Sequence, residues 1–220
     1  MSRPRHRIRV FALVTIAALL GLGLTTGVAA DAARTTTKKV TAEELAFHDA
    51  MRKLWEDHIT WTRMFIVEFA AGSAATQPTL DRLLQNQVDI GDAIQPFYGQ
   101  AAGDRLTELL TDHILVAGDI LSAAKAGDQD AVDEAVARWY ANADDIAMFL
   151  AAANPSNWPF DEMRAMLRDH LDLTLAEAVA RLQGRFEADI AAYEDVHVQA
   201  LEMADMLSAG IIDQFPGAFR

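Results

Sequence analysis

The sequence predicts an all-α protein in which three αα-hairpins pack into one six-helix bundle with pseudo-threefold character. Apolar residues recur at steps of three and four over long stretches, as they do on the buried face of an amphipathic helix. No stretch alternates apolar and polar residues as a half-buried strand does. The breaks between helical stretches are short, so consecutive helices are expected to run antiparallel.

Residues 1–30 have the three parts of a secretory signal peptide. Four arginines within the first nine residues form a basic start, an apolar run follows, and small residues lead to Ala30. We expect cleavage before Asp31, which gives an exported protein, either secreted or held in the cell envelope. The alternative is an uncleaved membrane anchor, because counting the glycines and threonines extends the apolar run to about 20 residues. Residues 31–40 lack apolar periodicity and are expected to form a flexible leader.

The remaining chain, residues 41–220, is expected to form a single helical domain. Thr41 followed by Glu44 matches a capping box, and Gly72 supplies an end for the helix that begins there. Further helices are expected at about 78–96, 103–126, 129–153, 159–183 and 185–214. The three hairpins then span about 41–99, 100–155 and 156–216.

Charge and composition exclude several classes of function. After residue 30 the chain carries 15 Lys and Arg against 32 Asp and Glu, a net charge of −17, and so acidic a surface repels nucleic acid. Cysteine is absent, which removes disulfides, thiolate metal sites and cysteine nucleophiles. No glycine-rich phosphate loop, Gly-x-Ser-x-Gly elbow or His-Glu-x-x-His motif occurs, so α/β nucleotide-dependent transferases are disfavoured.

An internal repeat is the most informative feature of the sequence. Three helices carry Asp-His followed by Ile or Leu, and in each a glycine lies 14 residues after the histidine. The helices between them share a polar residue followed, three positions later, by Asp and an apolar residue; the third match is weaker, with Glu as the polar residue. The repeated histidines are His58, His113 and His170, the glycines Gly72, Gly127 and Gly184, and the aspartates Asp89, Asp145 and Asp205.

Each repeated histidine lies on the apolar stripe of its helix and therefore needs a hydrogen-bond partner, because an unpaired buried polar group costs about 1–3 kcal/mol. The expected partner is the Asp or Asn of the facing helix. Imidazoles and carboxylates that converge inside a bundle are ligands for a divalent metal such as Zn, Mn, Fe or Cu. The predicted metal ligands are His58, His113, His170, Asp89, Asp145 and Asp205, and the predicted supporting residues are Asn86, Asn142, Glu202, Thr62 and Thr174.

Two other interpretations of the histidines stay open. In the first, each His–Asp pair only holds two helices in register, and the protein is a non-catalytic structural or interaction module. In the second, a His–Asp pair acts as acid and base on a bound substrate, although nothing in the sequence marks a nucleophile or a substrate pocket. Whether the protein is an enzyme, and which small ligand or protein partner it has, therefore stays open. A membrane contact is expected only through an uncleaved N-terminal segment.

Two further features have both a structural and a functional interpretation. Methionines at helical spacing near His170 are suited to Cu(I), although core packing is preferred because methionine commonly fills irregular gaps between helices. They are Met163, Met166, Met203 and Met206. Arg63 either pairs with an inner carboxylate, binds an anion, or lies on the surface with its aliphatic stem packed down.

Four stretches of the chain resemble an uncharacterised family of small, exported, all-helical bacterial proteins. The most specific is Leu-Trp-Glu-Asp-His-Ile-Thr-Trp-Thr-Arg at 54–63, and the others lie at 84–91, 139–144 and 200–205. The resemblance spans about residues 45–216 and implies an exported helical protein. Some members of that family carry an automatic glycosyltransferase label, but this chain has no nucleotide-sugar fold to support it. The resemblance implies no mechanism.

Overall fold

The computed structural model describes residues 39–220, which form six α-helices, one short 3₁₀ helix and no β-strand. The expected all-α fold is therefore confirmed for this part of the chain. The expected signal peptide and nearly all of the expected leader fall outside the described residues. Within residues 39–220, no helix is both long enough and apolar enough to cross a membrane. The elements are α1 (Ala42–Ala71), α2 (Thr76–Tyr98), α3 (Gln100–Ala126), α4 (Gln129–Ala153), α5 (Phe160–Leu182), α6 (Phe186–Gln214) and η1 (Pro216–Ala218).

The ends of the odd-numbered helices follow the capping signals in the sequence. The Thr41 hydroxyl accepts a hydrogen bond from the Glu44 N–H at 3.0 Å, and the Glu44 carboxylate accepts one from the Thr41 N–H at 2.9 Å. This reciprocal pair is the expected capping box. Gly72 after α1, Gly127 after α3 and Gly184 after α5 have φ of 65°, 73° and 69°, a left-handed conformation that glycine adopts without steric cost.

Two helices begin earlier than the sequence predicts. α2 begins at Thr76, ahead of Pro78, and continues through Pro96 to Tyr98. Proline is tolerated at residue 78 because the N–H groups of a first turn have no acceptor within the helix. α3 begins directly after Gly99, whose φ of 85° turns the chain in a single residue. The first hairpin therefore joins the second almost without a loop.

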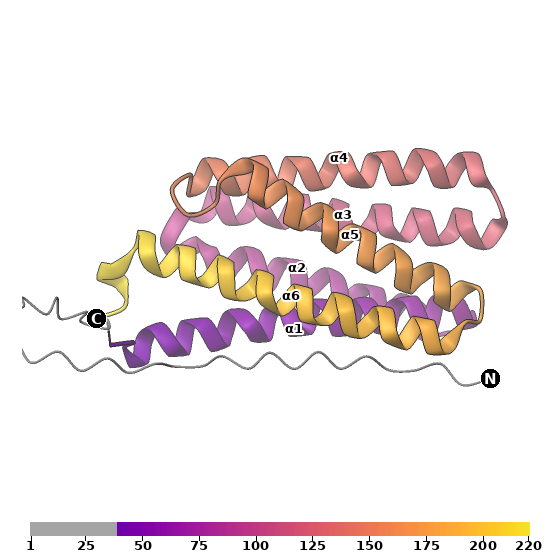
Figure 1. Ribbon diagram of the computed structural model, residues 1–220, viewed down its shortest axis with the longest axis horizontal. Helices are drawn as coiled ribbons and strands as arrows, with labels where there is room; N and C mark the ends of the chain where they lie inside the picture. Colours follow the sequence, from indigo (N-terminus) through magenta and orange to yellow (C-terminus); the bar gives the residue numbers. More distant parts are fainter. Residues whose placement is uncertain (1–38) are drawn as a thin grey trace, which may run out of the picture. The chain divides into compact units, whose positions relative to one another are not determined.

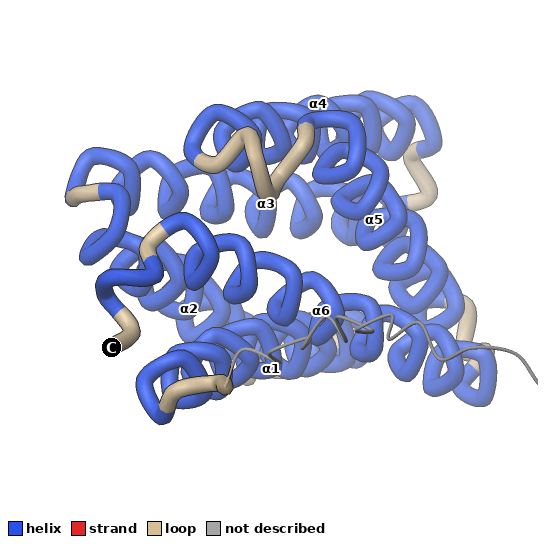
Figure 2. Tube along the Cα trace, turned by 60° about the vertical axis from the view of Figure 1, so that its left-hand side comes forward, coloured by secondary structure: helices blue, strands red, loops and turns tan. Residues whose placement is uncertain are grey.

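The six helices close into a ring (Figures 1 and 2). Each helix packs against its neighbours in the sequence, and α6 returns to pack against α1, which also contacts α3 and α5. The Thr41 hydroxyl donates to the Phe219 carbonyl at 3.0 Å, and the rings of Phe47 and Phe219 have centroids 5.2 Å apart. The start of α1 therefore lies beside the C-terminal end of the chain.

Two glycines allow close approaches that fix the positions of helices. A Cβ on Gly91 of α2 would overlap the Thr107 hydroxyl and lie 2.6 Å from the backbone oxygen of Gly103 in α3. A Cβ on Gly210 of α6 would overlap the indole of Trp158. These contacts leave no room for a side chain, so glycine is required for steric reasons at both positions.

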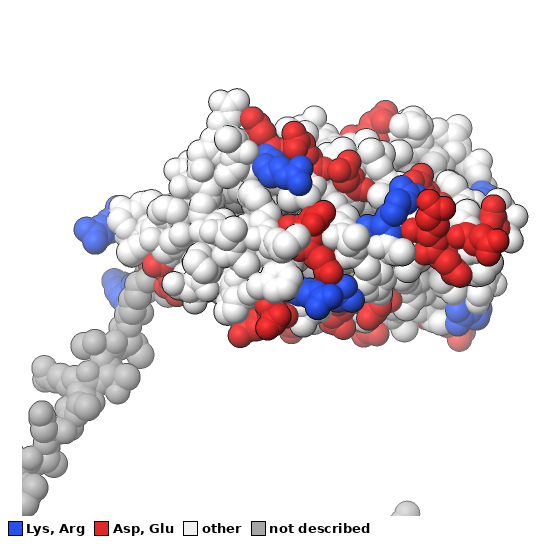
Figure 3. Space-filling view, turned by 90° about the horizontal axis from the view of Figure 1, so that it is seen from above, with Lys and Arg blue, Asp and Glu red and all other residues white. Residues whose placement is uncertain are grey.

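The apolar core reaches all six helices, and charged side chains stay on the surface in most places. On the face that Figure 3 shows, acidic and basic side chains are intermixed and no continuous basic area is visible. Arg164 and Arg168, for example, both donate to Asp144 at 2.8–3.0 Å. The interior also contains polar side chains, among them a layer of histidines and a cluster of ion pairs.

Candidate functional site

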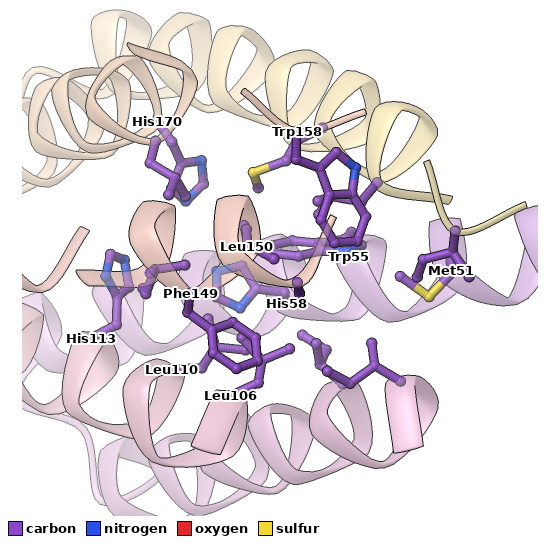
Figure 4. A pocket seen from close by; sticks show the side chains of 18 of the residues that line it. Met51, Trp55, His58, Leu106, Leu110, His113, Phe149, Leu150, Trp158 and His170 are labelled. Carbon is purple, nitrogen blue, oxygen red and sulfur yellow. The ribbon is translucent and has the colours of Figure 1, made fainter. Parts of the chain in front are cut away.

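Three histidines from different helices meet in the interior of the bundle. His58 of α1, His113 of α3 and His170 of α5 are 2%, 5% and 4% exposed. The ring centroids of His58 and His170 are 6.0 Å apart, and those of His113 and His170 are 6.5 Å apart. Figure 4 shows the three imidazoles around a common space between the helices. The structure therefore brings these three predicted residues together.

The histidines border a cavity of about 40 Å³ whose walls come from all six helices. The rest of its lining is aliphatic or aromatic and includes Met51, Trp55, Trp158 and Met203. A second apolar cavity of about 30 Å³ begins one turn further along α1 and α5, at Thr62 and Thr174. The imidazoles thus form a polar layer between two apolar spaces. The first cavity has room for a few water molecules or one small ion, and it is far too small for a nucleotide or a sugar.

Amide side chains determine how two of the histidines are protonated. Asn142 donates from Nδ2 to a backbone carbonyl of α3, which leaves its Oδ1 3.0 Å from His113 Nδ1. Gln199 donates from Nε2 to a backbone carbonyl of α5, which leaves its Oε1 2.9 Å from His170 Nδ1. Since an amide oxygen only accepts, both Nδ1 atoms carry a hydrogen and both Nε2 atoms keep a lone pair.

The contacts of His58 differ from those of the other two histidines. Gln87 Nε2 donates to the Leu83 carbonyl at 2.7 Å and lies 3.4 Å from His58 Nδ1. The same Nε2 lies 3.3 Å from Asn86 Oδ1, and Asn86 also hydrogen-bonds His58, so two amides of α2 contact this imidazole. Within the described part of the chain, Gln87 Oε1 is buried without a hydrogen-bond partner.

Burial keeps all three imidazoles neutral. Burial, together with the neighbouring His170 and His113, lowers the pKa of His58 to about 3. Burial and the neighbouring His170 lower the pKa of His113 to about 3, and burial lowers the pKa of His170. The layer therefore presents uncharged imidazole nitrogens at neutral pH, without competition from bound protons.

The three predicted aspartates lie at the surface, and none lines the cavity. Asp89 accepts from Gln85 at 3.1 Å, Asp205 accepts from Arg52 at 2.6 Å, and Asp145 is exposed. The expected partner was an Asp or Asn of the facing helix: Asn142 has this role for His113, whereas none of the three aspartates is hydrogen-bonded to a repeated histidine. An ionised carboxylate in an apolar cavity needs a cation beside it, whereas a neutral amide supplies the hydrogen bond without a charge.

The predicted supporting residues also make different contacts. Thr62 and Thr174 donate at 2.8 Å to the backbone carbonyl one turn earlier in their own helices, not to an imidazole. Asn86 donates to a backbone carbonyl of α1 at 3.0 Å, and Glu202 is exposed. Of the five, Asn142 and Asn86 contact the side chain of a repeated histidine, His113 and His58 respectively.

Sequence reasoning missed two of the three amides, Gln87 and Gln199. A signal was present, because each repeated histidine is contacted by an amide that lies 29 residues after it. The residue types differ among the three hairpins, so a search for matching letters does not find them. A constant offset on facing helices is the pattern that identifies such partners.

Within residues 39–220, no group of three or more His, Cys, Asp or Glu side chains is close enough together to hold a metal ion. The geometry of the histidine layer explains this. With a metal–nitrogen bond of about 2.0–2.1 Å and about 1.1 Å from nitrogen to ring centre, imidazoles at tetrahedral or trigonal angles have centroids about 5.1–5.5 Å apart. The observed separations of 6.0 Å and 6.5 Å are longer.

A cluster of ion pairs joins α1, α5 and α6. Arg63 donates from both terminal nitrogens to Asp189, and its Nη1 also donates to Glu177 Oε1 at 2.9 Å. Arg181 donates to Asp189 at 3.3 Å, and the side chains of Glu177 and Asp189 are 0% exposed. The interpretation of Arg63 as the partner of an inner carboxylate is confirmed.

The two carboxylates of this cluster are not equivalent. Burial raises the pKa of Glu177 to about 7, against the opposing effect of Arg63. Among the described residues, Glu177 Oε2 has no hydrogen-bond partner. At Asp189 burial acts in the same upward direction, but the hydrogen bonds and charges of Arg63 and Arg181 outweigh it and lower the pKa. Asp189 is therefore the ionised partner of Arg63, and Glu177 is the residue that titrates near neutrality.

Comparisons of the chain with protein-family models, with curated proteins and with solved structures find no match.

Proposed function

We propose that the protein binds one transition-metal ion in the interior of its helical bundle, through the Nε2 atoms of His58, His113 and His170. The observation that carries the proposal is the meeting of three neutral imidazoles, one from each odd-numbered helix, at one small cavity. Helical bundles commonly hold metals on side chains that project inward from facing helices. Ligation by all three rings requires them to approach one another by about 1 Å.

The amides beside the histidines support ligation. A histidine ligand usually donates its other ring N–H to an oxygen, which fixes the ring and directs its lone pair at the metal. His113 and His170 already donate in this way, and His58 hydrogen-bonds the amides of Gln87 and Asn86. With no carboxylate in the cavity lining, the donor set suits Zn, Cu or Fe better than Mn.

The same contacts support an origin of the bundle in three αα-hairpins. The amides that contact the backbone of the odd helices bond to the residue four positions before each repeated histidine: Asn86 to Leu54, Asn142 to Leu109, and Gln199 to Met166. In the first hairpin, Asn86 bonds both the α1 backbone and His58, as one amide does in the others, and Gln87 is a second amide on the same imidazole. We therefore propose that each hairpin supplies one histidine and its amide support.

A structural or interaction module is the second candidate, and the same hydrogen bonds favour it. Each amide joins two helices through a backbone carbonyl and an imidazole, so it fixes their register without any ion.

Export to the cell envelope is part of either proposal, and it is supported by the basic, apolar and small-residue pattern of residues 1–30.

Metal content distinguishes the two candidates. The full chain is produced in its native exported form and purified without chelator or nickel affinity, and the metal per chain is measured by elemental mass spectrometry. The metal proposal predicts about one ion per chain, and a melting temperature that falls when the ion is removed. A folded, metal-free protein whose melting temperature does not respond to added Zn(II) or Cu(I) would overturn the proposal and leave the structural module.

A pair of histidine variants locates the site. His113→Leu keeps a side chain of similar size in the core and removes one imidazole ligand, so the bound metal is expected to be lost. His197→Leu is the matched control, because His197 contacts Glu56 at the surface and not the cavity. Equal metal content in both variants would show that the ion lies elsewhere.

A further inference from the structure

The lining of the histidine cavity holds no negative charge. It contains three neutral imidazoles and otherwise aliphatic, aromatic and thioether side chains. The free energy of moving an ion into such surroundings grows with the square of its charge, so a divalent ion is penalised about four times as strongly as a monovalent one. Without a carboxylate, this cavity therefore suits a monovalent ion.

Two thioethers line the cavity, those of Met51 and Met203, and Met203 lies close in sequence to an amide that contacts a histidine. Met203 is 1% exposed, lines the cavity and follows Gln199 by one helical turn, on the same face of α6. The residues one turn after Asn86 and Asn142 are Ile90 and Ile146, which line the same cavity. The third hairpin thus places a soft sulfur ligand where the other two place aliphatic carbon.

The spacing of the rings points to a low coordination number. Two imidazoles in line across one ion have ring centroids about 6.3 Å apart, from metal–nitrogen bonds of about 2.0–2.1 Å. The measured separations of 6.0 Å and 6.5 Å bracket this value. Cu(I) accepts nearly linear pairs of ligands and trigonal sets, whereas Zn(II) in protein sites is almost always tetrahedral.

Resting on the metal site proposed above, we infer that the resident ion is copper in the Cu(I) state, held by the cavity-facing imidazole nitrogens together with the thioether of Met203. Imidazole and thioether donors select Cu(I) over the harder divalent ions. Binding is simple ligation: the ion enters as Cu(I), two or three nitrogen and sulfur lone pairs bond to it, and no electron is transferred.

The test is a competition for Cu(I) under anaerobic conditions. The full chain is titrated into a coloured complex of Cu(I) with a chromogenic chelator, and loss of colour reports transfer to the protein. We expect one Cu(I) per chain, and we expect a tenfold excess of Zn(II) to leave the titration unchanged. Binding of Zn(II) but not Cu(I) would overturn this inference and keep the proposed metal site, whereas binding of neither would overturn both.

Two methionine variants test the thioether. Met203→Leu keeps the volume of the side chain and removes the sulfur, so Cu(I) affinity is expected to fall by about tenfold or more, the size of effect that a supporting contact at a metal site produces. Met51→Leu is the matched control, because Met51 lines the same cavity two turns before His58. Equal affinities of the two variants would exclude Met203 as a ligand.

Discussion

Glu177 makes the stability of the bundle depend on pH in a direction unusual for a carboxylate. Its side chain is 0% exposed, and burial raises its pKa from 4.5 to about 7 although Arg63 donates to it at 2.9 Å. The other charged groups around it are Arg181 of α5 and Asp189 of α6. Replacing it with glutamine, as in Glu177→Gln, removes the titration and leaves a neutral side chain of the same shape.

The sign follows from proton uptake. Between pH 4.5 and pH 7 the folded chain holds a proton on Glu177 that the unfolded chain has lost, so the contribution of this residue to stability falls as pH rises through this window. A difference of about 2.5 pKa units at about 1.4 kcal/mol each gives about 3 kcal/mol over the whole window. About 2–3 kcal/mol of this change falls between pH 5 and pH 8.

The assay is urea unfolding of the wild type and of Glu177→Gln at several pH values from 5 to 8. The cavity histidines also make stability depend on pH, because burial lowers their pKa, but their effect is common to both proteins and cancels in the difference. We expect the stability of the wild type relative to the variant to fall by about 2–3 kcal/mol from pH 5 to pH 8. Glu202→Gln, an exposed change on α6, is the control and should give a flat difference. A flat difference for Glu177→Gln as well would refute the assignment of Glu177 as a buried group that ionises near neutrality.

Three further expectations follow from packing and hydrogen bonding, each measured as a free energy of unfolding in denaturant. Gly91→Ala should destabilise the protein by about 1–3 kcal/mol or more, because the added Cβ meets the backbone of α3. Gly118→Ala should stabilise it by about 0.5–1 kcal/mol, because an added Cβ at this position of α3 meets no close neighbour. Effects of the same sign would contradict the close approach of α2 and α3. Asn142→Leu should cost about 1–3 kcal/mol, because it leaves the buried His113 Nδ1 without a partner and removes a second hydrogen bond from the Leu109 carbonyl of α3. A neutral result would mean that water replaces the amide. Thr41→Ala should cost about 1 kcal/mol through loss of the capping box, and an unchanged melting curve would show that the start of α1 is frayed in solution.

Local signals made much of the fold predictable. A glycine with positive φ ends a helix for a backbone reason that is independent of the rest of the fold, so Gly72, Gly127 and Gly184 were identifiable from the sequence. The apolar stripes placed His58 and His113 inside for a similar reason, since periodicity reports which face is buried. The start of α2 was less predictable, because a proline is compatible with several positions in a first turn.

Pairing between helices was less predictable than helix position. Asp89 and Asp205 repeat visibly in the sequence, but an aspartate near the edge of a helix face lies in solvent whenever a neutral amide fills the interior position. Glu177 and Asp189 show the reverse case. A buried carboxylate cannot be told from a solvated one by residue type, and the positions of Arg63 and Arg181 beside them make the burial of Glu177 and Asp189 favourable. Such choices depend on three-dimensional partners that one sequence does not reveal.

The contact between the start of α1 and the C-terminal end of the chain means that the ring of helices could begin at a different helix. With Thr41 bonded to Phe219, a short linker would join the two ends without moving either helix. The exposed turn at Gly127 and Asp128 offers a place to open the chain instead. A circular permutant cut there opens the turn between α3 and α4 and should still fold to the same ring, because each helix keeps the helices against which it packs.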